Sequence, residues 1–410
     1  MTWVIRAAIL QGVRILEVAE QTFVPSAAAL LSDYGAEVVK IEHHERGDAM
    51  RGLASAGIMS TSGDVHALME HSNRGKKSLG LNLMTDEGRE VLYKLAAQSD
   101  VFLHNKLPSV RTKLKCDVDD IRAVNPNIIY VSGTGQGERG PDADRGAYDS
   151  LAFWNRSGVA YATTRPEYGH LVGLPGPGFG DSLGGMTIAG GIMGALFHRE
   201  RTGEALTVDV SLLATGMWAM GQSIALSLLS NLPQQPLPLE FMHPNPTVGA
   251  YRTKDERWLV MSSLQPGKYF PEFVTLLGRP EWATDARFAD HAAIMENRAE
   301  AVELIKARVG EMTVAEVREA LHEFSGQWAI AQDTLEVAVD PQTEANGYLQ
   351  DVETASGSPF KLVAAPVQYG GAPVAARRAP EFNEHGDEIL AGLGLDWDTI
   401  VDYKVRGIVA

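Results

Sequence analysis

The stretch GVRILEVAEQTFVPSAAALLSDYGAEVVKIE, residues 12–42, decides the fold class. Its two apolar runs, residues 13–19 and 36–42, have the length and the β-branched content of buried strands. Between them Pro25 opens a helix rich in alanine and leucine, and Gly35 ends it. Two strands joined by one helix form a right-handed parallel βαβ unit. The sequence therefore predicts an α/β domain at this end of the chain.

Further strands of the same sheet are predicted at residues 101–104 and 128–131, with a helix over 85–98 before the first of them. The glycine-rich residues 133–140 then look like a dinucleotide-binding fingerprint. That motif must open a helix at once, whereas Pro141 and the polar residues after it indicate a loop. We therefore predict a flexible connection here and no dinucleotide site.

A second glycine-rich loop, GPGFGDS at residues 176–182, ends in a carboxylate and precedes an apolar run over 183–198. The run predicts a buried helix, and Asp181 stands where its N-cap is expected. The N–H groups of the first helical turn would keep the carboxylate ionised, and glycines let a substrate approach. Such a group can act as a nucleophile. Local sequence alone nevertheless favours a simple capping role for Asp181.

Composition narrows the function classes. The chain has 410 residues, of which 45% are hydrophobic, and a formal net charge of −16, which argues against nucleic acid and anionic membrane as partners. Cys116 is the only cysteine, so neither a disulfide nor a cysteine metal cluster is expected, and a cytoplasmic location fits. The adjacent residues 43–45, His-His-Glu, do not have metal-ligand spacing, so no metal site is expected. Residues 1–10 do not read as a signal peptide, and no run has membrane-spanning length.

The second half of the chain predicts a smaller α+β region behind a proline-rich linker at residues 232–246. Its predicted elements, with those that flank it, are a strand at 207–213 running into a helix to about 229, a hairpin of 249–253 with 258–261, helices at 268–277 and 298–309, a helix begun by the capping box Thr313–Glu316, a short strand at 366–369 and a helix at 388–393. We see no internal repeat.

Residues 73–77, Asn-Arg-Gly-Lys-Lys, place three cations beside a short strand predicted at 78–82. This grouping suits phosphate binding, and a solvated turn explains it equally well from local sequence.

Several blocks taken together resemble the class III CoA-transferases, the family of formyl-CoA transferase and carnitine CoA-transferase, with the α-methylacyl-CoA racemases as near relatives. The blocks that carry the resemblance are residues 12–42, the GD..R of 47–51, NRGKKSLGLN and its continuation at 73–105, GFGDSLGG and its continuation at 178–213, NPTVGAYRTKDERW at 245–258, LGRPEW at 277–282 and EHGDEILAGLGL at 384–395. Their order and spacing are more specific than any one motif.

The resemblance implies a Rossmann-like large domain built from residues 1–224 and 331–410, with a small α+β domain, residues 225–330, inserted between them. It also implies an interlocked homodimer with active sites between the subunits.

For function, the resemblance implies an acyl-CoA:carboxylate CoA-transferase in which Asp181 is the nucleophile. The substrates would be an acyl-CoA donor and a carboxylic acid acceptor, with coenzyme A thioester as substrate and no permanently bound cofactor. The carboxylate would form an anhydride and then an aspartyl-CoA thioester. Transfer between two molecules and an internal shift between two carboxylates of one molecule both fit these residues.

The resemblance also carries over CoA contacts, position by position. These are Gln21, Thr22, His43, Asn73, Lys76, Lys77, Asn105, Lys106, Arg111 and Lys113. Three positions depart from the family pattern, because His43 replaces an arginine, Gly75 an asparagine and Lys106 a phenylalanine.

Two alternatives remain at this stage. The racemases carry an acid/base histidine where this chain has Tyr148, and the tyrosine favours transfer because its unperturbed pKa is about 10. The neighbouring Asp149 is expected to be a structural acceptor. A non-catalytic acyl-CoA-binding protein is the third reading, and the retained Asp181 argues against it.

A substrate pocket is expected around Tyr148, Trp154, Arg156, Gly178 and Gly180. In it Trp154 would line the acyl group and Arg156 would hold the acid's carboxylate. The alternative places the aromatic residues in the core and Arg156 in a surface ion pair. The functional reading predicts a medium-sized or aromatic acid before formate or oxalate.

Overall fold

The computed structural model describes residues 8–55, 63–236 and 245–410. The predicted linker at 232–246 and the signal-peptide question at 1–10 fall largely outside these ranges. The chain divides into two compact units, one of residues 1–236 with 341–410 and one of residues 237–340.

The first unit is built on a six-stranded parallel sheet, which confirms the predicted α/β class. Its strand order is β3-β2-β1-β4-β5-β6. The strands are β1 (Arg14–Val18), β2 (Glu37–His43), β3 (Lys77–Leu81), β4 (Val101–His104), β5 (Ile129–Thr134) and β6 (Thr207–Ser211). Since β1 lies between β2 and β4, the chain reverses its direction of winding at β1. Ligands of open parallel sheets bind beside such a reversal, at the carboxyl ends of the strands.

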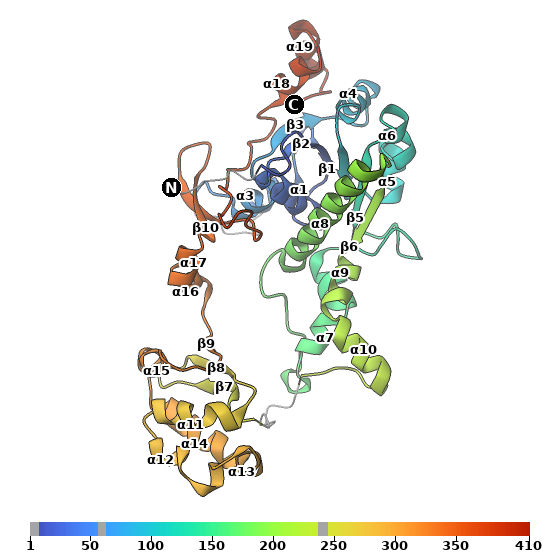
Figure 1. The fold of residues 1–410 in the computed structure, drawn as a ribbon. Coiled ribbons are helices and arrows are strands. Elements are labelled where there is room, and N and C mark those ends of the chain that lie inside the picture. Colours follow the sequence, from blue (N-terminus) through green and yellow to red (C-terminus); the bar gives the residue numbers. More distant parts are fainter. Residues whose placement is uncertain (1–7, 56–62, 237–244) are drawn as a thin grey trace. The chain divides into compact units, whose positions relative to one another are not determined.

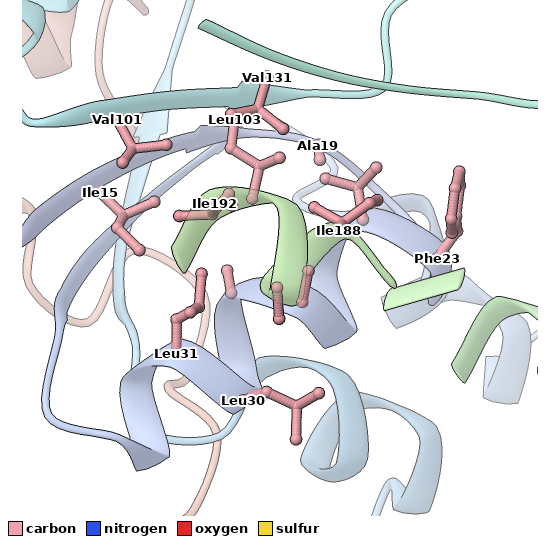
Figure 2. Close-up of a cluster of buried hydrophobic side chains, with 14 of the residues drawn as sticks. Ile15, Ala19, Phe23, Leu30, Leu31, Val101, Leu103, Val131, Ile188 and Ile192 are labelled. Carbon is pink, nitrogen blue, oxygen red and sulfur yellow. The ribbon is translucent and has the colours of Figure 1, made fainter. Parts of the chain in front are cut away.

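Helices cover both faces of this sheet (Figure 1). On one face α1 (Phe23–Asp33) and α8 (Phe179–Thr202) pack side by side, and on the other lie α4 (Asp86–Ala96), α6 (Val118–Val124), α18 (Gly386–Gly392) and α19 (Trp397–Val405). Figure 2 shows the first interface, where Ile15, Leu103 and Val131 of the sheet meet Ile188 and Ile192 of α8. The carboxyl-terminal helices therefore complete a core begun at the other end of the chain.

The remaining elements of this unit connect or flank these layers. They are η1 (Ala49–Arg51), α2 (Gly52–Ser55), α3 (Ala67–Asn73), α5 (Pro108–Leu114), the π-helix η2 (Ser150–Arg156), α7 (Val159–Thr163), η3 (Pro166–Tyr168), α9 (Leu212–Ala219), α10 (Gly221–Ser230), α17 (Pro341–Ala345), β10 (Leu349–Glu353) and β11 (Pro359–Val363). No single described helix has the length and apolarity to cross a bilayer, and only the sharply bent pair α9–α10 meets both criteria together.

The second unit has its own core around a three-stranded antiparallel sheet in the order β7-β8-β9. The predicted hairpin is confirmed as β7 (Val248–Arg252) and β8 (Trp258–Ser262), and the capping box of Thr313 and Glu316 does start α15 (Val314–Ala320). The other elements are α11 (Pro266–Leu276), α12 (Pro280–Ala283), η4 (Ala286–Phe288), α13 (His291–Glu296), α14 (Arg298–Gly310), β9 (Trp328–Ile330) and α16 (Thr334–Ala338).

Two sequence predictions need correction. Residues 366–369 form no strand, and Tyr369 makes only an isolated bridge to Ala372. The antiparallel pair β10–β11 was missed instead. Only two of its ten residues, Val352 and Leu362, are buried, and its alternation of apolar and polar residues is weak.

The close approach of α1 and α8 depends on two glycines of α8. A Cβ at Gly184 would lie 2.4 Å from the Phe23 ring, and one at Gly185 would lie 1.9 Å from Ser26 Oγ and 3.0 Å from the Phe23 carbonyl oxygen. At Gly185 the nearby atoms include backbone atoms of α1, so movement of side chains alone cannot make room for a Cβ. Small residues at these positions therefore set the distance between the two helices.

We predict that Gly185→Ala lowers the free energy of unfolding by about 1–3 kcal/mol, the usual cost of overpacking. Denaturant unfolding measures this. Gly190→Ala is the matched control, since a Cβ at Gly190 meets open space on the same helix; it should leave stability unchanged or raise it by about 0.5–1 kcal/mol. Equal losses in both variants would show that helix packing does not depend on Gly185.

Candidate active site

The helix that carries Asp181 begins at a glycine. Gly178 is the N-cap of α8, with φ of 66°, so Asp181 is the third helical residue and not the N-cap that the sequence predicted. The backbone at Gly178 lies in the left-handed region that glycine adopts without strain. Sequence reasoning placed the cap at the carboxylate, because a capping glycine leaves no side-chain signature.

The capping acceptor comes from another segment. Asp149 Oδ2 accepts a hydrogen bond from the Gly180 backbone N–H at 3.0 Å, and the rest of Asp149 is buried. Its second oxygen, Oδ1, has no hydrogen-bond partner among the described residues. A Cβ at Gly180 would lie 2.5 Å from that oxygen and 2.3 Å from the Phe153 ring. Asp149 is therefore the structural acceptor that was expected, and it requires glycine at position 180.

The electrostatics of Asp181 differ from the sequence prediction. Burial, and to a lesser extent the neighbouring charge of Asp149, together raise the pKa of Asp181 to about 7. No cation pairs with Asp181 among the described residues. The attraction of the helix N-terminus was expected to keep this carboxylate ionised, and that expectation is wrong, because loss of hydration and a second carboxylate outweigh it. Near neutral pH the group is present in both protonation states.

Gln21 and Thr22 lie next to this helix start. Thr22 is the N-cap of α1, and its Cγ2 stands 3.0 Å from the point that a Cβ of Gly178 would occupy. Gln21 has φ of 72°, which is unusual for a residue other than glycine. The structure therefore brings these two predicted CoA-contact residues to the loop that leads to Asp181.

A hollow of about 90 Å³ lies at the carboxyl ends of the central strands. It is lined by Glu20, His43, His44, Lys106 and eight further residues from β1, β2, the end of β3 with the loop after it, and α5. The His43 and His44 rings stack at 4.7 Å, and burial and the neighbouring His44 lower the pKa of His43. Lys106 Nζ forms an ion pair with Glu20 at 2.9 Å. His43 and Lys106, two of the predicted contacts, thus share one cavity at the edge where ligands bind this class of sheet.

Asn105 and Lys113 lie at the same end of the sheet, after β4. Asn105 holds the backbone of Glu20, with its Nδ2 donating to the Glu20 carbonyl oxygen at 2.7 Å. Lys113 is exposed on α5. Arg111, two residues earlier, is already paired with Glu138 through two contacts of 2.8 and 2.9 Å. Of these cations, Lys113 is the one open to solvent.

Asn73, Lys76 and Lys77 do not join the cavity. Lys76 is fully buried, where it donates to Glu17 Oε2 at 2.7 Å and to Asn73 Oδ1 at 3.0 Å, and burial lowers its pKa to about 8. It has no surface left for a phosphate. Lys77 is the first residue of β3, so it lies at the amino end of the strand, away from the cavity at the carboxyl ends. It pairs with Glu388 at 2.8 Å. Their local pattern gave no sign of Glu17, 59 residues away in the chain.

The predicted substrate pocket is only partly brought together. Tyr148 is 66% exposed beside Asp149, whereas Trp154 is 5% exposed and donates its Nε1–H to the Val172 carbonyl oxygen at 2.8 Å. Arg156 forms an ion pair with Asp142 at 2.6 Å. The core and surface-pair alternative therefore describes Trp154 and Arg156. Sequence reasoning missed Phe179, which is 42% exposed two residues before Asp181 and packs edge-on against Trp154 at 6.2 Å.

Comparison with known proteins agrees with this geometry. A family model described as CoA-transferase family III matches residues 10–386. The chain belongs to CoA-transferase family III. It is therefore a CoA-transferase, whose substrates are CoA thioesters.

Named relatives match this CoA-transferase over almost its whole length. It is 29% identical to (R)-2-hydroxy-4-methylpentanoate CoA-transferase of Clostridioides difficile, over 98% of this chain and 99% of that protein. It is also 29% identical to cinnamoyl-CoA:phenyllactate CoA-transferase of Clostridium sporogenes, over 93% of both chains. A solved CAIB/BAIF family protein from Brucella suis superposes with a TM-score of 0.79 at 28% identity, covering 94% of this chain and 99% of the other.

We predict that Asp149→Asn lowers the pKa of Asp181 below about 7, because the amide removes the neighbouring charge and keeps an acceptor for the Gly180 N–H. Isotope-edited infrared titration of the Asp181 carboxyl measures the change. Asp402→Asn, at an exposed site on α19, is the control and should leave the titration unchanged. An unchanged pKa in Asp149→Asn would assign the whole shift to burial.

Proposed function

We propose that this family III enzyme is an acyl-CoA:carboxylate CoA-transferase with Asp181 as its covalent nucleophile. The observation that carries the proposal is the position of Asp181, which lies in the first turn of α8, unpaired with any described cation and beside two glycines. Its pKa of about 7 makes the ionised form available at neutral pH and more nucleophilic than an ordinary carboxylate.

The reaction then proceeds by four successive attacks of a carboxylate or a thiolate on a carbonyl carbon, and none of them requires a net proton transfer. The Asp181 carboxylate attacks the thioester carbonyl, the C–S bond breaks, and CoA leaves as thiolate from an acyl-aspartyl anhydride. The thiolate attacks the aspartyl carbonyl, the C–O bond breaks, and the donor acid leaves from an aspartyl-CoA thioester. The acceptor carboxylate attacks this thioester and expels the thiolate, which finally attacks the acceptor's carbonyl and releases Asp181.

The contacts to CoA are proposed at the carboxyl edge of the sheet. Support comes from the cavity lined by His43 and Lys106, from the exposed Lys113, and from Gln21 and Thr22 beside α8. Cations beside a cavity at this edge suit the phosphates of CoA. Backbone N–H groups of the loop would stabilise the oxyanions, each worth roughly 3–4 kcal/mol. The Gly180 N–H is not among them, because Asp149 occupies it.

We predict that acyl-CoA followed by hydroxylamine leaves a hydroxamate on Asp181, detected by intact-mass spectrometry, and that Asp181→Ala abolishes it. Because only the ionised form attacks, adduct formation should rise about tenfold per pH unit below pH 7 and level off above it. Asp209→Ala, which removes a carboxylate from strand β6, is the control. An adduct that persists in Asp181→Ala would exclude this nucleophile. Deuterium exchange at C2 of a 2-methylacyl-CoA without any adduct would indicate a racemase.

We also propose a medium-sized or aromatic acceptor acid. The half-exposed Phe179 ring beside Asp181 supports this class, as do relatives whose names specify a branched hydroxy acid and phenyllactate. Phe179→Ala should lower kcat/KM for an aromatic acid by about tenfold and leave that for acetate nearly unchanged. Exchange restricted to one- and two-carbon acids would contradict the proposal.

The active enzyme is proposed to be a homodimer, and a cytoplasmic location remains a prediction of the sequence. Support comes from large apolar side chains on α9 and α10, with Trp218 88% exposed, Leu228 80% and Leu229 85%. Large apolar side chains exposed on two consecutive helices fit an association surface.

We predict a dimer in sedimentation analysis of the wild-type protein, and monomers after Trp218→Glu with Leu229→Glu, because two buried charges would be unpaired in the interface. Leu335→Glu, equally exposed in the second unit, is the control. A wild-type monomer, or a double variant that remains dimeric, would contradict the use of this surface.

A further inference from the structure

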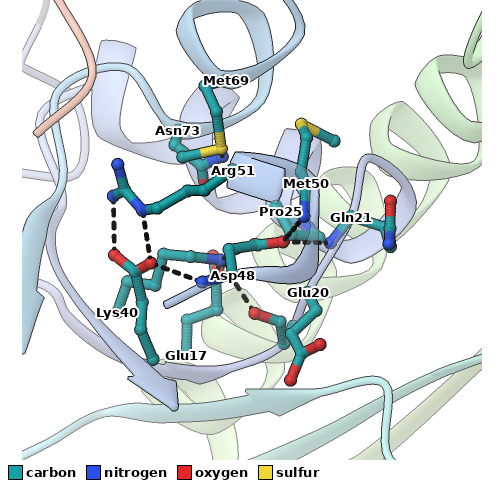
Figure 3. Close-up of polar contacts among 12 residues, drawn as sticks. Glu17, Glu20, Gln21, Pro25, Lys40, Asp48, Met50, Arg51, Met69 and Asn73 are labelled. Atoms are coloured by element: carbon teal, nitrogen blue, oxygen red, sulfur yellow. Dashed lines mark hydrogen bonds and ion pairs between the residues drawn. The ribbon is translucent and has the colours of Figure 1, made fainter. Parts of the chain in front are cut away.

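Four charged side chains are buried together beneath the turn that joins β1 to α1. We call this set the charge network; its members are Glu17, Lys40, Asp48 and Lys76, and all four side chains are 0% exposed. Figure 3 labels three of them, Glu17, Lys40 and Asp48, together with Gln21 and Pro25. Two lysines balance two carboxylates. Charges so far from water persist only when each is paired, so this arrangement constrains its surroundings closely.

The network is continuous. Lys40 Nζ lies 2.9 Å from Glu17 Oε1 and 2.8 Å from Asp48 Oδ2, and Lys76 Nζ lies 2.7 Å from Glu17 Oε2. Glu17 thus joins the two lysines, and Lys40 joins the two carboxylates. Four side chains from β1, β2, the loop after β2 and the start of β3 form one unit.

The same side chains hold the backbone of the β1–α1 turn at three points. Lys40 donates to the Ala19 carbonyl oxygen at 2.8 Å, and Lys76 donates to the Pro25 carbonyl oxygen at 2.8 Å. Between these points, Asp48 Oδ1 accepts from the Gln21 N–H at 3.0 Å. The turn is therefore fixed from below at both ends and at its middle.

The middle contact falls on the residue with the least favourable backbone. Gln21 has φ of 72°, a conformation that costs a residue with a Cβ roughly 1–2 kcal/mol. Such a conformation persists only where the surroundings determine it. The hydrogen bond to Asp48 supplies that constraint, and Thr22, the next residue, then packs against Gly178 at the start of the Asp181 helix.

We infer that Asp48, held by Lys40, is a positioning residue for the transfer reaction: it fixes Gln21 in its left-handed conformation and so sets the β1–α1 turn against the helix start that carries Asp181. The inference rests on the proposed function for its catalytic consequence. Its structural part is independent of that function, because it concerns the conformation of Gln21 alone.

The test compares two double variants that differ in whether the side chain at position 48 offers an acceptor to the Gln21 N–H and to the Met50 N–H, which the same Asp48 oxygen accepts at 2.9 Å. Lys40→Met with Asp48→Asn keeps an oxygen at that point, and Lys40→Met with Asp48→Ala removes it. Both leave Lys76 balanced by Glu17, so neither creates an unpaired buried charge. Crystal structures give φ at position 21, steady-state transfer gives kcat and KM, and thermal unfolding gives stability.

The asparagine double variant should keep the positive φ at Gln21. The alanine double variant should lose it, with kcat at least about tenfold below that of the asparagine variant at similar stability, since small misplacements in an active site are costly. Equal kcat values with an unchanged Gln21 would overturn the inference. A kcat difference that only follows a difference in stability would overturn it as well.

The same measurements also distinguish two further outcomes from each other. If the wild-type protein transfers no CoA, the proposed function fails, and the crystal structures still decide whether Asp48 fixes Gln21. If the alanine variant does not fold, Gln21→Val compared with Gln21→Asn replaces it, because valine strongly disfavours positive φ and asparagine accepts it. A Gln21→Val enzyme as fast as Gln21→Asn would then overturn the inference.

Discussion

The contact between α1 and α8 is the constraint on which the rest of the first unit depends. The glycines of α8 allow the two helices to approach until side-chain and backbone atoms of Phe23 and Ser26 touch it. One consequence is a core in which both helices share the same face of the sheet. The second consequence concerns the beginnings of the two helices. They meet, and Thr22 can lie beside Gly178 only because the helices are this close.

Electrostatics then distinguishes two kinds of buried charge in the same region. Among the described residues Asp181 has a carboxylate neighbour and no paired cation, so burial leaves it with a raised pKa. Lys40 and Glu17 are more completely buried than Asp181, and each is neutralised by a partner of opposite charge. The first arrangement keeps a group reactive at the expense of stability, whereas the second fixes backbone positions.

The sequence was sufficient to predict the elements that depend on local periodicity. Apolar runs located the strands β1, β2, β4 and β5, alternation located β6, and the short strand predicted at 78–82 is β3. The capping box located α15. The candidate site was harder, because its decisive contacts join residues far apart in the chain. Asp149 raises the pKa of Asp181 across about thirty residues, and Glu17 withdraws Lys76 from the surface across 59. A lysine beside a glycine looks the same in sequence whether it meets a phosphate or a buried glutamate. Opposite charges within two neighbouring apolar strands, at Glu17 and Lys40, were the available signal for the network.

The isolation of Cys116 has a practical side. This sole cysteine is fully buried, and burial raises its pKa to about 12, so its thiolate is scarce and out of reach of solvent. A thiol-reactive chromogenic disulfide added to the folded protein would therefore react with released coenzyme A and not with the polypeptide. Turnovers that stop after CoA has been released could therefore be counted, because the polypeptide gives no signal of its own. The protein would also tolerate oxidising conditions that inactivate enzymes with exposed thiols.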